Sequence, residues 1–185
     1  ATAATPLVVF FHGGSWDTGS KNIYRFVGRG LTAQGYVVAI PKYRLFPQVT
    51  FPAFVEDAAS AFAAIEDRVQ AGADGLPAVP HPMALMGHSA GAEIAALLAF
   101  DRSHLDAAGS SRERISAFVG LAGPYAFLPL TDQRHKPLCP PALPQRRHHL
   151  NYADGTRPPP LVARASRRGR VDVSALVVVF QQNNF

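Results

Sequence analysis

The chain has 185 residues, 48% of them hydrophobic, which is enough for a single domain with a sizeable core. It contains no run of 18 apolar residues, so no transmembrane helix is predicted, and its single cysteine, Cys139, excludes an internal disulfide. The net charge of +5 is uneven: residues 1–130 hold 9 basic and 10 acidic residues, whereas residues 131–185 hold 9 basic and 3 acidic ones. The chain begins with Ala1 and enters an apolar run within a few residues, which favours a fragment or a processed product.

Four short apolar runs predict strands. They are Leu7–Phe11, Val37–Ile40, Met83–Met86 and Ile115–Val119. Leu7–Phe11 is apolar without interruption, as in a strand buried on both faces. Segments with helical spacing separate the four runs, and this alternation favours adjacent parallel strands. The sequence therefore predicts an α/β fold with a mostly parallel sheet and helices on both faces.

The intervening segments show helical periodicity of different strengths. The helix predicted to open at Phe51-Pro52-Ala53 is the clearest, since its apolar residues fall on one face. These are Phe54, Ala58, Ala61, Phe62, Ile65 and Val69. Ile94, Leu97 and Leu98 predict a core-facing helix after the third strand. Lys21–Gln34 has apolar residues at helical spacing, including Ile23 and Phe26, but two glycines interrupt it.

Gly87-His88-Ser89-Ala90-Gly91 matches G-x-S-x-G and lies where the third predicted strand meets the following helix. In a nucleophile elbow the serine occupies a strained strand-to-helix turn, and the glycines let strand and helix pass closely. Ser89 is therefore the candidate nucleophile. An ordinary glycine-rich turn is the alternative interpretation.

His12-Gly13-Gly14-Ser15-Trp16 follows the first predicted strand. Acyl transfer by serine needs N–H donors for the oxyanion, typically from the residue after the serine and from a glycine-rich loop. Ala90 together with Gly13 or Gly14 is predicted to form this oxyanion hole. His12 is expected to order the loop, while Trp16 is equally compatible with an acyl-pocket wall and with the core.

With these two motifs, residues Pro6 to Pro124 resemble the carboxylesterase branch of the α/β-hydrolases that carries HGG-x-W and G-H-S-A-G, including feruloyl-esterase-like and kynurenine-formamidase-like enzymes. The stretch YRLFPQVTFPAFVEDAASAFAAI is similar to the strand-turn-helix that follows the family's oxyanion loop. The resemblance implies an α/β-hydrolase fold, here truncated, a small-molecule ester or acyl substrate, and no cofactor.

In that family the acid and the histidine of the triad follow the serine along the chain. After Ser89 the histidines are His104, His135, His148 and His149. The stretch LNYADGTRPP resembles the family's approach to the late strand that carries the acid, but PLVARASRRGRV after it does not resemble that strand or its acidic turn. No histidine lies beyond His149, so the resemblance supplies neither triad partner. His148 or His149 is the candidate base, while His88 is expected to pack or hydrogen-bond near the elbow and His104 to lie at the surface. No residues show metal-ligand spacing, so no metal site is predicted.

Residues 131–185 form a basic tail rich in proline and arginine, separate from a hydrolase core at residues 1–130. Apart from an apolar run at 174–180 that predicts a strand, it shows no sustained periodicity. No aromatic residues alternate with its arginines as a single-strand-binding surface requires, so we expect a poorly ordered tail and no nucleic-acid partner.

Ester hydrolysis through an acyl-enzyme on Ser89 is the function predicted from the sequence. Two alternatives stay open: a catalytically inactive hydrolase-like domain, and an arylformamide or peptide hydrolase that uses the same groups. Because the acid and base are not identified, the chain is expected to hydrolyse short esters poorly. Its sheet edges are also expected to be bare, which predicts marginal stability and self-association.

Overall fold

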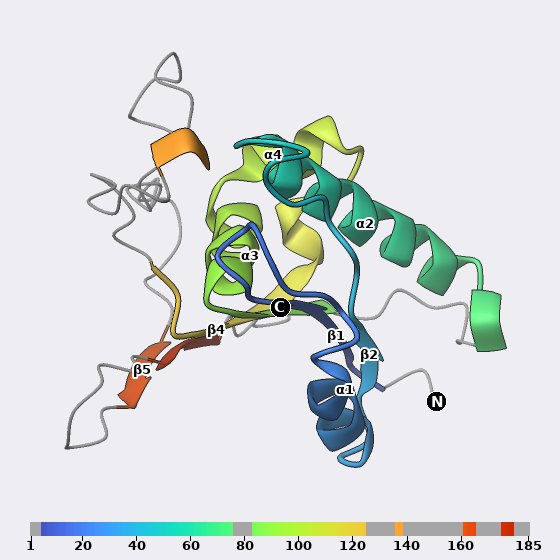
Figure 1. The fold of residues 1–185 in the computed structure, drawn as a ribbon. Helices are drawn as coiled ribbons and strands as arrows, with labels where there is room; N and C mark the ends of the chain where they lie inside the picture. The colour runs from blue at the N-terminus through green and yellow to red at the C-terminus, as the bar shows by residue number, and fades with distance from the viewer. Residues whose placement is uncertain (1–4, 76–82, 125–135, 139–160, 166–174, 180–185) are drawn as a thin grey trace.

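The computed structural model describes residues 5–75, 83–124, 136–138, 161–165 and 175–179. Their strands form one sheet (Figure 1), and its strand order is β2-β1-β3-β4-β6-β5. The strands are β1 (Leu7–Phe11), β2 (Val37–Ala39), β3 (Met83–His88), β4 (Ile115–Leu121), β5 (Leu161–Ala165) and β6 (Ala175–Val179).

The four strands predicted from the apolar runs are adjacent and parallel. β1 pairs with β2 on one side and with β3 on the other, and β3 pairs with β4. β1 lies between two neighbours and all five of its residues are buried, which explains why this strand has no polar residue. The predicted mostly parallel α/β sheet is confirmed.

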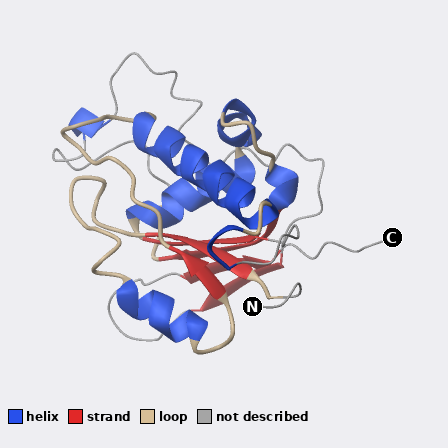
Figure 2. Cartoon of the chain, turned by 90° about the vertical axis from the view of Figure 1, so that its right-hand side faces the viewer, coloured by secondary structure: helices blue, strands red, loops and turns tan. Residues whose placement is uncertain are grey.

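Helices cover both faces of the sheet. α1 (Arg25–Thr32) lies on one face, and α2 (Ala53–Gln70), α3 (Ala90–Phe100) and α4 (Arg102–Ala107) lie on the other (Figure 2). Short 3₁₀ turns stand at Ala73–Gly75, Arg112–Arg114 and Lys136–Leu138. Among the described residues, no helix has the length and apolar character needed to cross a membrane.

The main core lies between the sheet and the α2–α3 layer. Alternate residues of β1 enter it (Leu7, Val9 and Phe11), as do Ile94 and Leu98 of α3. α2 begins at Ala53, as predicted, and contributes Phe54 and the rest of its apolar stripe. Within that stripe Ala61 and Ile65 are only partly buried, while Val55 and Ala59 are buried although the sequence pattern left them out.

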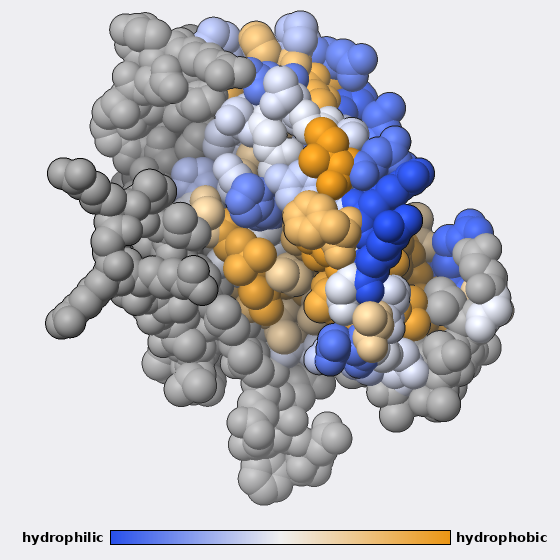
Figure 3. Space-filling model, turned by 60° about the horizontal axis from the view of Figure 1, so that its bottom comes forward, coloured by the Kyte–Doolittle hydropathy of each residue, from blue (hydrophilic) through white to orange (hydrophobic). Residues whose placement is uncertain are grey.

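α1 forms within Lys21–Gln34, the segment whose helical spacing is interrupted by two glycines. It buries none of its residues, and Phe26 is 66% exposed, as is Ile23 just before it at 64%. The helix approaches the sheet at Gly28, where an added Cβ would lie 3.4 Å from Cδ1 of Ile40. Phe26 is two positions away and therefore points to the opposite side of the helix. Figure 3 shows hydrophobic residues on the face of the molecule that carries α1.

β5 and β6 belong to the basic tail and join the sheet in the antiparallel sense. β6 pairs with β4, and β5 pairs with β6. β6 lies within the run at 174–180 where a strand was predicted, whereas β5 was not predicted. The division of the chain at residue 130 stays a prediction, since most of the tail lies outside the described residues.

Candidate active site

Ser89 lies between the end of β3 and the start of α3, in a backbone conformation that non-glycine residues rarely adopt. Its φ is 52° and its ψ is −120°. Such a conformation costs of order 1–3 kcal/mol and persists only where the surrounding structure imposes it. The Ser89 N–H donates to the Leu121 carbonyl at 2.8 Å, and its carbonyl accepts from Ala92 at 2.9 Å. Its side chain makes no cap bond to the helix, so the hydroxyl is left available for another role.

The two glycines of the motif are required by close backbone approach. A Cβ at Gly87 would collide with the backbone of Gly91 and Ala92, where β3 turns back into α3. A Cβ at Gly91 would collide with the carbonyls of Phe11 and His12 at the end of β1. The first turn of α3 therefore rests directly on the strand that leads into the glycine-rich loop.

Parallel pairing brings that loop to the same edge of the sheet as Ser89. Phe11 is in register with Gly87, so β1 and β3 end side by side. The chain leaves β1 toward β2 on one side and later returns to place β3 on the other. In open α/β sheets, ligands bind at such a switch point beyond the carboxyl ends of the strands.

Gly13 and Gly14 follow β1 and lie against the elbow. A Cβ on Gly13 would lie 2.8 Å from the His88 carbonyl oxygen, one residue before Ser89. Gly14 has φ of 132°, which a residue with a side chain rarely adopts. Gly14 also accepts a hydrogen bond from Thr18 N at 2.8 Å, which closes the loop into a turn. The structure thus brings three predicted segments together: the Gly13–Gly14 loop, Ser89, and Ala90 at the N-terminus of α3.

His12 orders this loop, as expected from the sequence. Its side chain is 1% exposed and stacks on Tyr43 with ring centroids 4.4 Å apart. Nδ1 lies 3.0 Å from the Gly13 carbonyl oxygen, so Nδ1 must carry the proton that it donates. Burial lowers the pKa of His12, although this hydrogen bond partly opposes the shift. The Tyr43 hydroxyl donates to the His12 carbonyl at 2.6 Å.

Trp16 belongs to the core rather than to an exposed pocket wall. Its side chain is 3% exposed and lies against Phe54 of α2, with ring centroids 6.3 Å apart. Of the two interpretations left open by the sequence, the structure favours the core.

Neither candidate base is placed at the site by the structure. His148 and His149 lie outside the described residues. Among the described histidines, His12 bonds to Gly13 and His88 bonds to Tyr24, and none is hydrogen-bonded to Ser89. The expectation that His88 forms a hydrogen bond near the elbow is confirmed. His12, His88 and Ser89 therefore do not form a triad.

Glu93 is a buried carboxyl one turn beyond Ser89 that the sequence analysis missed. Its side chain is 8% exposed, and burial raises the pKa of this group to about 8. Its position within an otherwise apolar helix, GAEIAALLAF, was the available signal. A carboxyl in such surroundings is neutral at pH 7.

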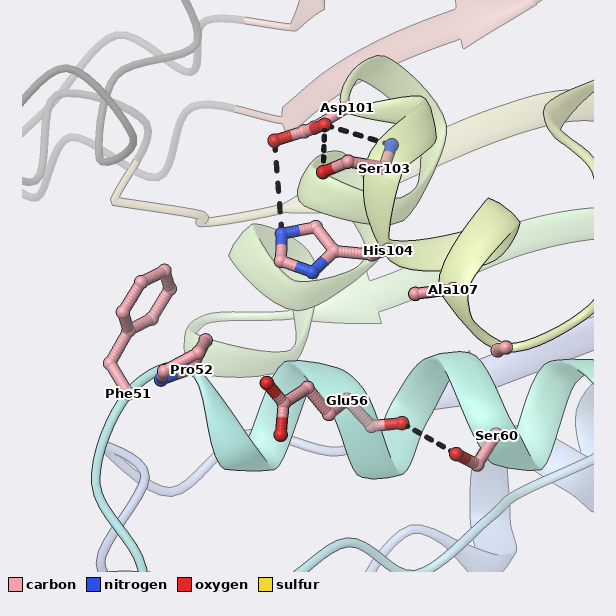
Figure 4. Close-up of a pocket in the computed structure, with 9 residues that line it drawn as sticks. Phe51, Pro52, Glu56, Ser60, Asp101, Ser103, His104 and Ala107 are labelled. Carbon is pink, nitrogen blue, oxygen red and sulfur yellow. Dashed lines mark hydrogen bonds and ion pairs between the residues drawn. The ribbon is translucent and has the colours of Figure 1, made fainter.

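A separate cavity of about 420 Å³ lies between α2 and α4 (Figure 4). It is lined by Phe51, Pro52, Glu56, Ser60, Asp101, Ser103, His104, Ala107 and Ala108, and includes neither Ser89 nor Gly13. The His104 side chain is 15% exposed and lies 3.8 Å from Asp101, so it is partly buried beside the cavity instead of fully exposed at the surface. Asp101 caps α4 by accepting from Ser103 N at 3.0 Å and from its hydroxyl at 2.6 Å. Because Ser103 bonds to Asp101 and not to His104, this cluster lacks a serine–histidine pair.

No group of three or more metal-ligating side chains gathers in the part of the chain that the structure describes. The geometry around Ser89 instead provides a strained serine, the N-terminus of α3 and a glycine loop. This set suits a tetrahedral oxyanion.

Comparisons with known proteins also find ester hydrolases. The BD-FAE family model matches residues 1–167. A probable isoprenylcysteine alpha-carbonyl methylesterase, ICMEL1, from Oryza sativa subsp. japonica is 36% identical over 141 residues, which are 73% of this chain and 32% of that protein. The carboxylesterase NlhH from Mycobacterium tuberculosis is 35% identical over 51% of this chain and 28% of its own. The chain thus spans about a third of the length of these relatives.

Solved esterases share the fold. A Rhizomucor miehei esterase superposes with a TM-score of 0.56 and 27% identity over 66% of this chain and 36% of its own. A Pyrobaculum calidifontis esterase superposes with a TM-score of 0.51 and 34% identity over 62% of this chain and 35% of its own. Since the family model covers most of the chain and the fold agrees, the chain belongs to the BD-FAE family of carboxylesterase-like α/β-hydrolases.

Proposed function

We propose that this protein is a serine hydrolase of carboxylic esters that forms an acyl-enzyme on Ser89. The observation that carries the proposal is the conformation of Ser89, with φ of 52° at the carboxyl end of β3. Strained backbone conformations persist only where the surrounding structure holds them in place, and they concentrate at functional sites. The methylesterase and carboxylesterase relatives support ester hydrolysis as the reaction class.

In the proposed reaction the Ser89 oxygen attacks the ester carbonyl and its proton passes to a base. The carbonyl oxygen becomes an oxyanion, held by the N–H of Ala90 and by that of Gly13 or Gly14. Collapse of the intermediate expels the alcohol, which takes up the proton, and leaves an acyl ester on Ser89. Water then releases the acid by the same steps. His148 or His149 is proposed as the base.

The proposed substrate is a small carboxylic ester. Each donor at the site is a backbone N–H, which recognises the reacting carbonyl and not the rest of the molecule. Selectivity therefore depends on residues that line the acyl and alcohol sides of Ser89. An arylformamide offers the same carbonyl, so it enters the test as a competing substrate.

The test is hydrolysis of p-nitrophenyl butyrate by the purified chain, by Ser89→Ala and by Ser60→Ala. Ser60 is an exposed serine on α2 and serves as the matched control. We expect Ser60→Ala to keep the wild-type rate and Ser89→Ala to lose it. Equal rates for the wild type and Ser89→Ala would refute the proposal. Faster hydrolysis of an aryl formamide than of the ester would instead favour amide hydrolysis as the reaction.

A further inference from the structure

Tyr24 and His88 form a hydrogen-bonded pair beside the proposed oxyanion loop. The Tyr24 hydroxyl lies 2.8 Å from Nδ1 of His88, although 64 residues separate the two. Tyr24 is the residue before α1, at the end of the segment that starts at Gly13. His88 is the last residue of β3 and directly precedes Ser89. The pair therefore joins the two segments that meet at the proposed site.

Packing holds the Tyr24 ring in place independently of its hydroxyl. The ring centroid lies 5.4 Å from that of Phe10 and 5.9 Å from that of Phe26. It also lies 6.2 Å from the His12 ring and 5.8 Å from the His88 ring. Phe10 is completely buried, so the Tyr24 ring packs against a side chain that the core holds in place. A phenylalanine at position 24 would keep these contacts and lose only the hydrogen bond.

Gly13 lies directly against the pair. A Cβ built on Gly13 would be 2.8 Å from Nδ1 of His88 and 2.9 Å from the Tyr24 hydroxyl. With no side chain between them, a shift of either partner moves the Gly13 peptide. Oxyanion donors must lie about 2.7–3.1 Å from the developing charge, and a misplacement of about 1 Å costs on the order of 100-fold in rate.

We infer that Tyr24 is a positioning residue, whose hydrogen bond to His88 holds Gly13 in place for the oxyanion. The inference rests on the proposed function, because Gly13 matters to the reaction only if Ser89 is acylated. Tyr24 itself acts through His88 and Gly13. Loss of the hydroxyl should therefore slow the chemical step about tenfold and leave the fold intact.

A first experiment observes Gly13 without relying on activity. His12-Gly13 is the only His-Gly pair in the sequence, so carbonyl-¹³C histidine with ¹⁵N-glycine isolates the Gly13 amide in an NMR spectrum of the full chain. We expect Tyr24→Phe to shift this resonance and to speed its hydrogen exchange. Tyr36→Phe is the matched control, because Tyr36 is 39% exposed and should leave Gly13 unchanged.

A second experiment measures how fast a fluorophosphonate probe labels the serine. Tyr24→Phe should lower the second-order labelling rate about tenfold, with the thermal unfolding midpoint close to that of the wild type. His88→Ala should slow labelling similarly. His88→Asn should restore part of the rate, since its side-chain amide stands near the place of Nδ1 and can donate or accept the same hydrogen bond. Rescue by asparagine is a result that a purely space-filling role would not give.

Two results would overturn the inference. One is a Gly13 resonance that Tyr24→Phe leaves unchanged. The other is labelling of Tyr24→Phe at the wild-type rate despite a shifted resonance. If the wild-type chain is not labelled at Ser89, the proposed function fails, and the Gly13 resonance alone then decides whether Tyr24 positions the loop.

Discussion

Ser89 combines an available hydroxyl with an unfavourable backbone, and the two can be separated by substitution. Glycine adopts positive φ without the steric cost that a Cβ imposes, whereas alanine keeps that cost. Ser89→Gly should therefore raise the free energy of unfolding by about 1 kcal/mol relative to Ser89→Ala. Urea unfolding of the two variants measures this difference. A glycine variant less stable than the alanine variant would argue against strain at this position.

Glu93 makes the stability of the fold depend on pH. Burial raises its pKa to about 8 in the folded chain, above the ordinary value of 4.5. Between these values the unfolded chain loses the proton that the folded chain keeps. Stability therefore falls as pH rises from 4.5 toward 8, with a limiting slope of about 1.4 kcal/mol per pH unit, and levels off above.

Glu93→Gln should remove this dependence. Its stability advantage over the wild type should be small near pH 4.5 and should grow up to pH 8. Urea unfolding at pH 5, 6.5 and 8 measures the trend. Glu56→Gln is the control, because Glu56 is exposed on α2 and should show no such growth. Parallel pH curves for the wild type and Glu93→Gln would contradict the account.

The residues of the candidate site differed in how well they could be predicted. Ser89 and Gly13 stand in local motifs, and the need for glycine at a tight turn is visible in the sequence itself. Tyr24 and His88 meet only because β1 and β3 are neighbours in the sheet, so no local sequence pattern predicts their hydrogen bond. Burial of Glu93 was missed because a single acidic residue in a helix ordinarily faces water.

At the scale of elements, the contact between α3 and β1 decides whether the site forms. Gly91 touches the Phe11 and His12 carbonyls, so Gly91→Ala would force α3 away from the strand. We expect a loss of about 3 kcal/mol or more in the free energy of unfolding, as for other backbone clashes in a packed core. Thermal and urea unfolding measure the loss.

Gly30→Ala is the control for this substitution. Gly30 lies within α1 and has no atom within 4 Å of an added Cβ. Alanine there should stabilise the chain by about 0.5–1 kcal/mol, because glycine is a poor helix former. A Gly91→Ala variant as stable as the wild type would show that the elbow does not depend on this contact.

The four parallel strands were predictable because each is a short apolar run bounded by turn residues. The direction in which the apolar side chains near α1 point was not predictable from the sequence. The sequence showed only that Ile23 and Phe26 stand at helical spacing, whereas in the structure both are exposed and α1 approaches Ile40 at Gly28. The antiparallel entry of β5 and β6 was also not predictable, because pairing partners in a sheet are chosen by long-range contacts that a local pattern does not contain.

At the scale of the whole molecule, the proposed nucleophile and the proposed oxyanion groups lie together without a described histidine bonded to Ser89. A site with an oxyanion hole and no working triad retains about 10³–10⁴-fold acceleration over the uncatalysed reaction. With His148 or His149 as the base, as proposed, turnover of p-nitrophenyl acetate by this chain should exceed that range, and turnover confined to it would contradict the proposed base. Much faster turnover, lost in His148→Ala or His149→Ala, would show that one of these histidines serves as the base.

Covalent capture tests whether Ser89 is the nucleophile. The purified chain is treated with a fluorophosphonate, digested, and mapped by mass spectrometry. We predict one phosphonate per chain, carried by the peptide that contains Ser89, with no adduct in Ser89→Ala and an unchanged adduct in Ser60→Ala. A phosphonate on another residue, or an equal adduct in the wild type and Ser89→Ala, would contradict the assignment.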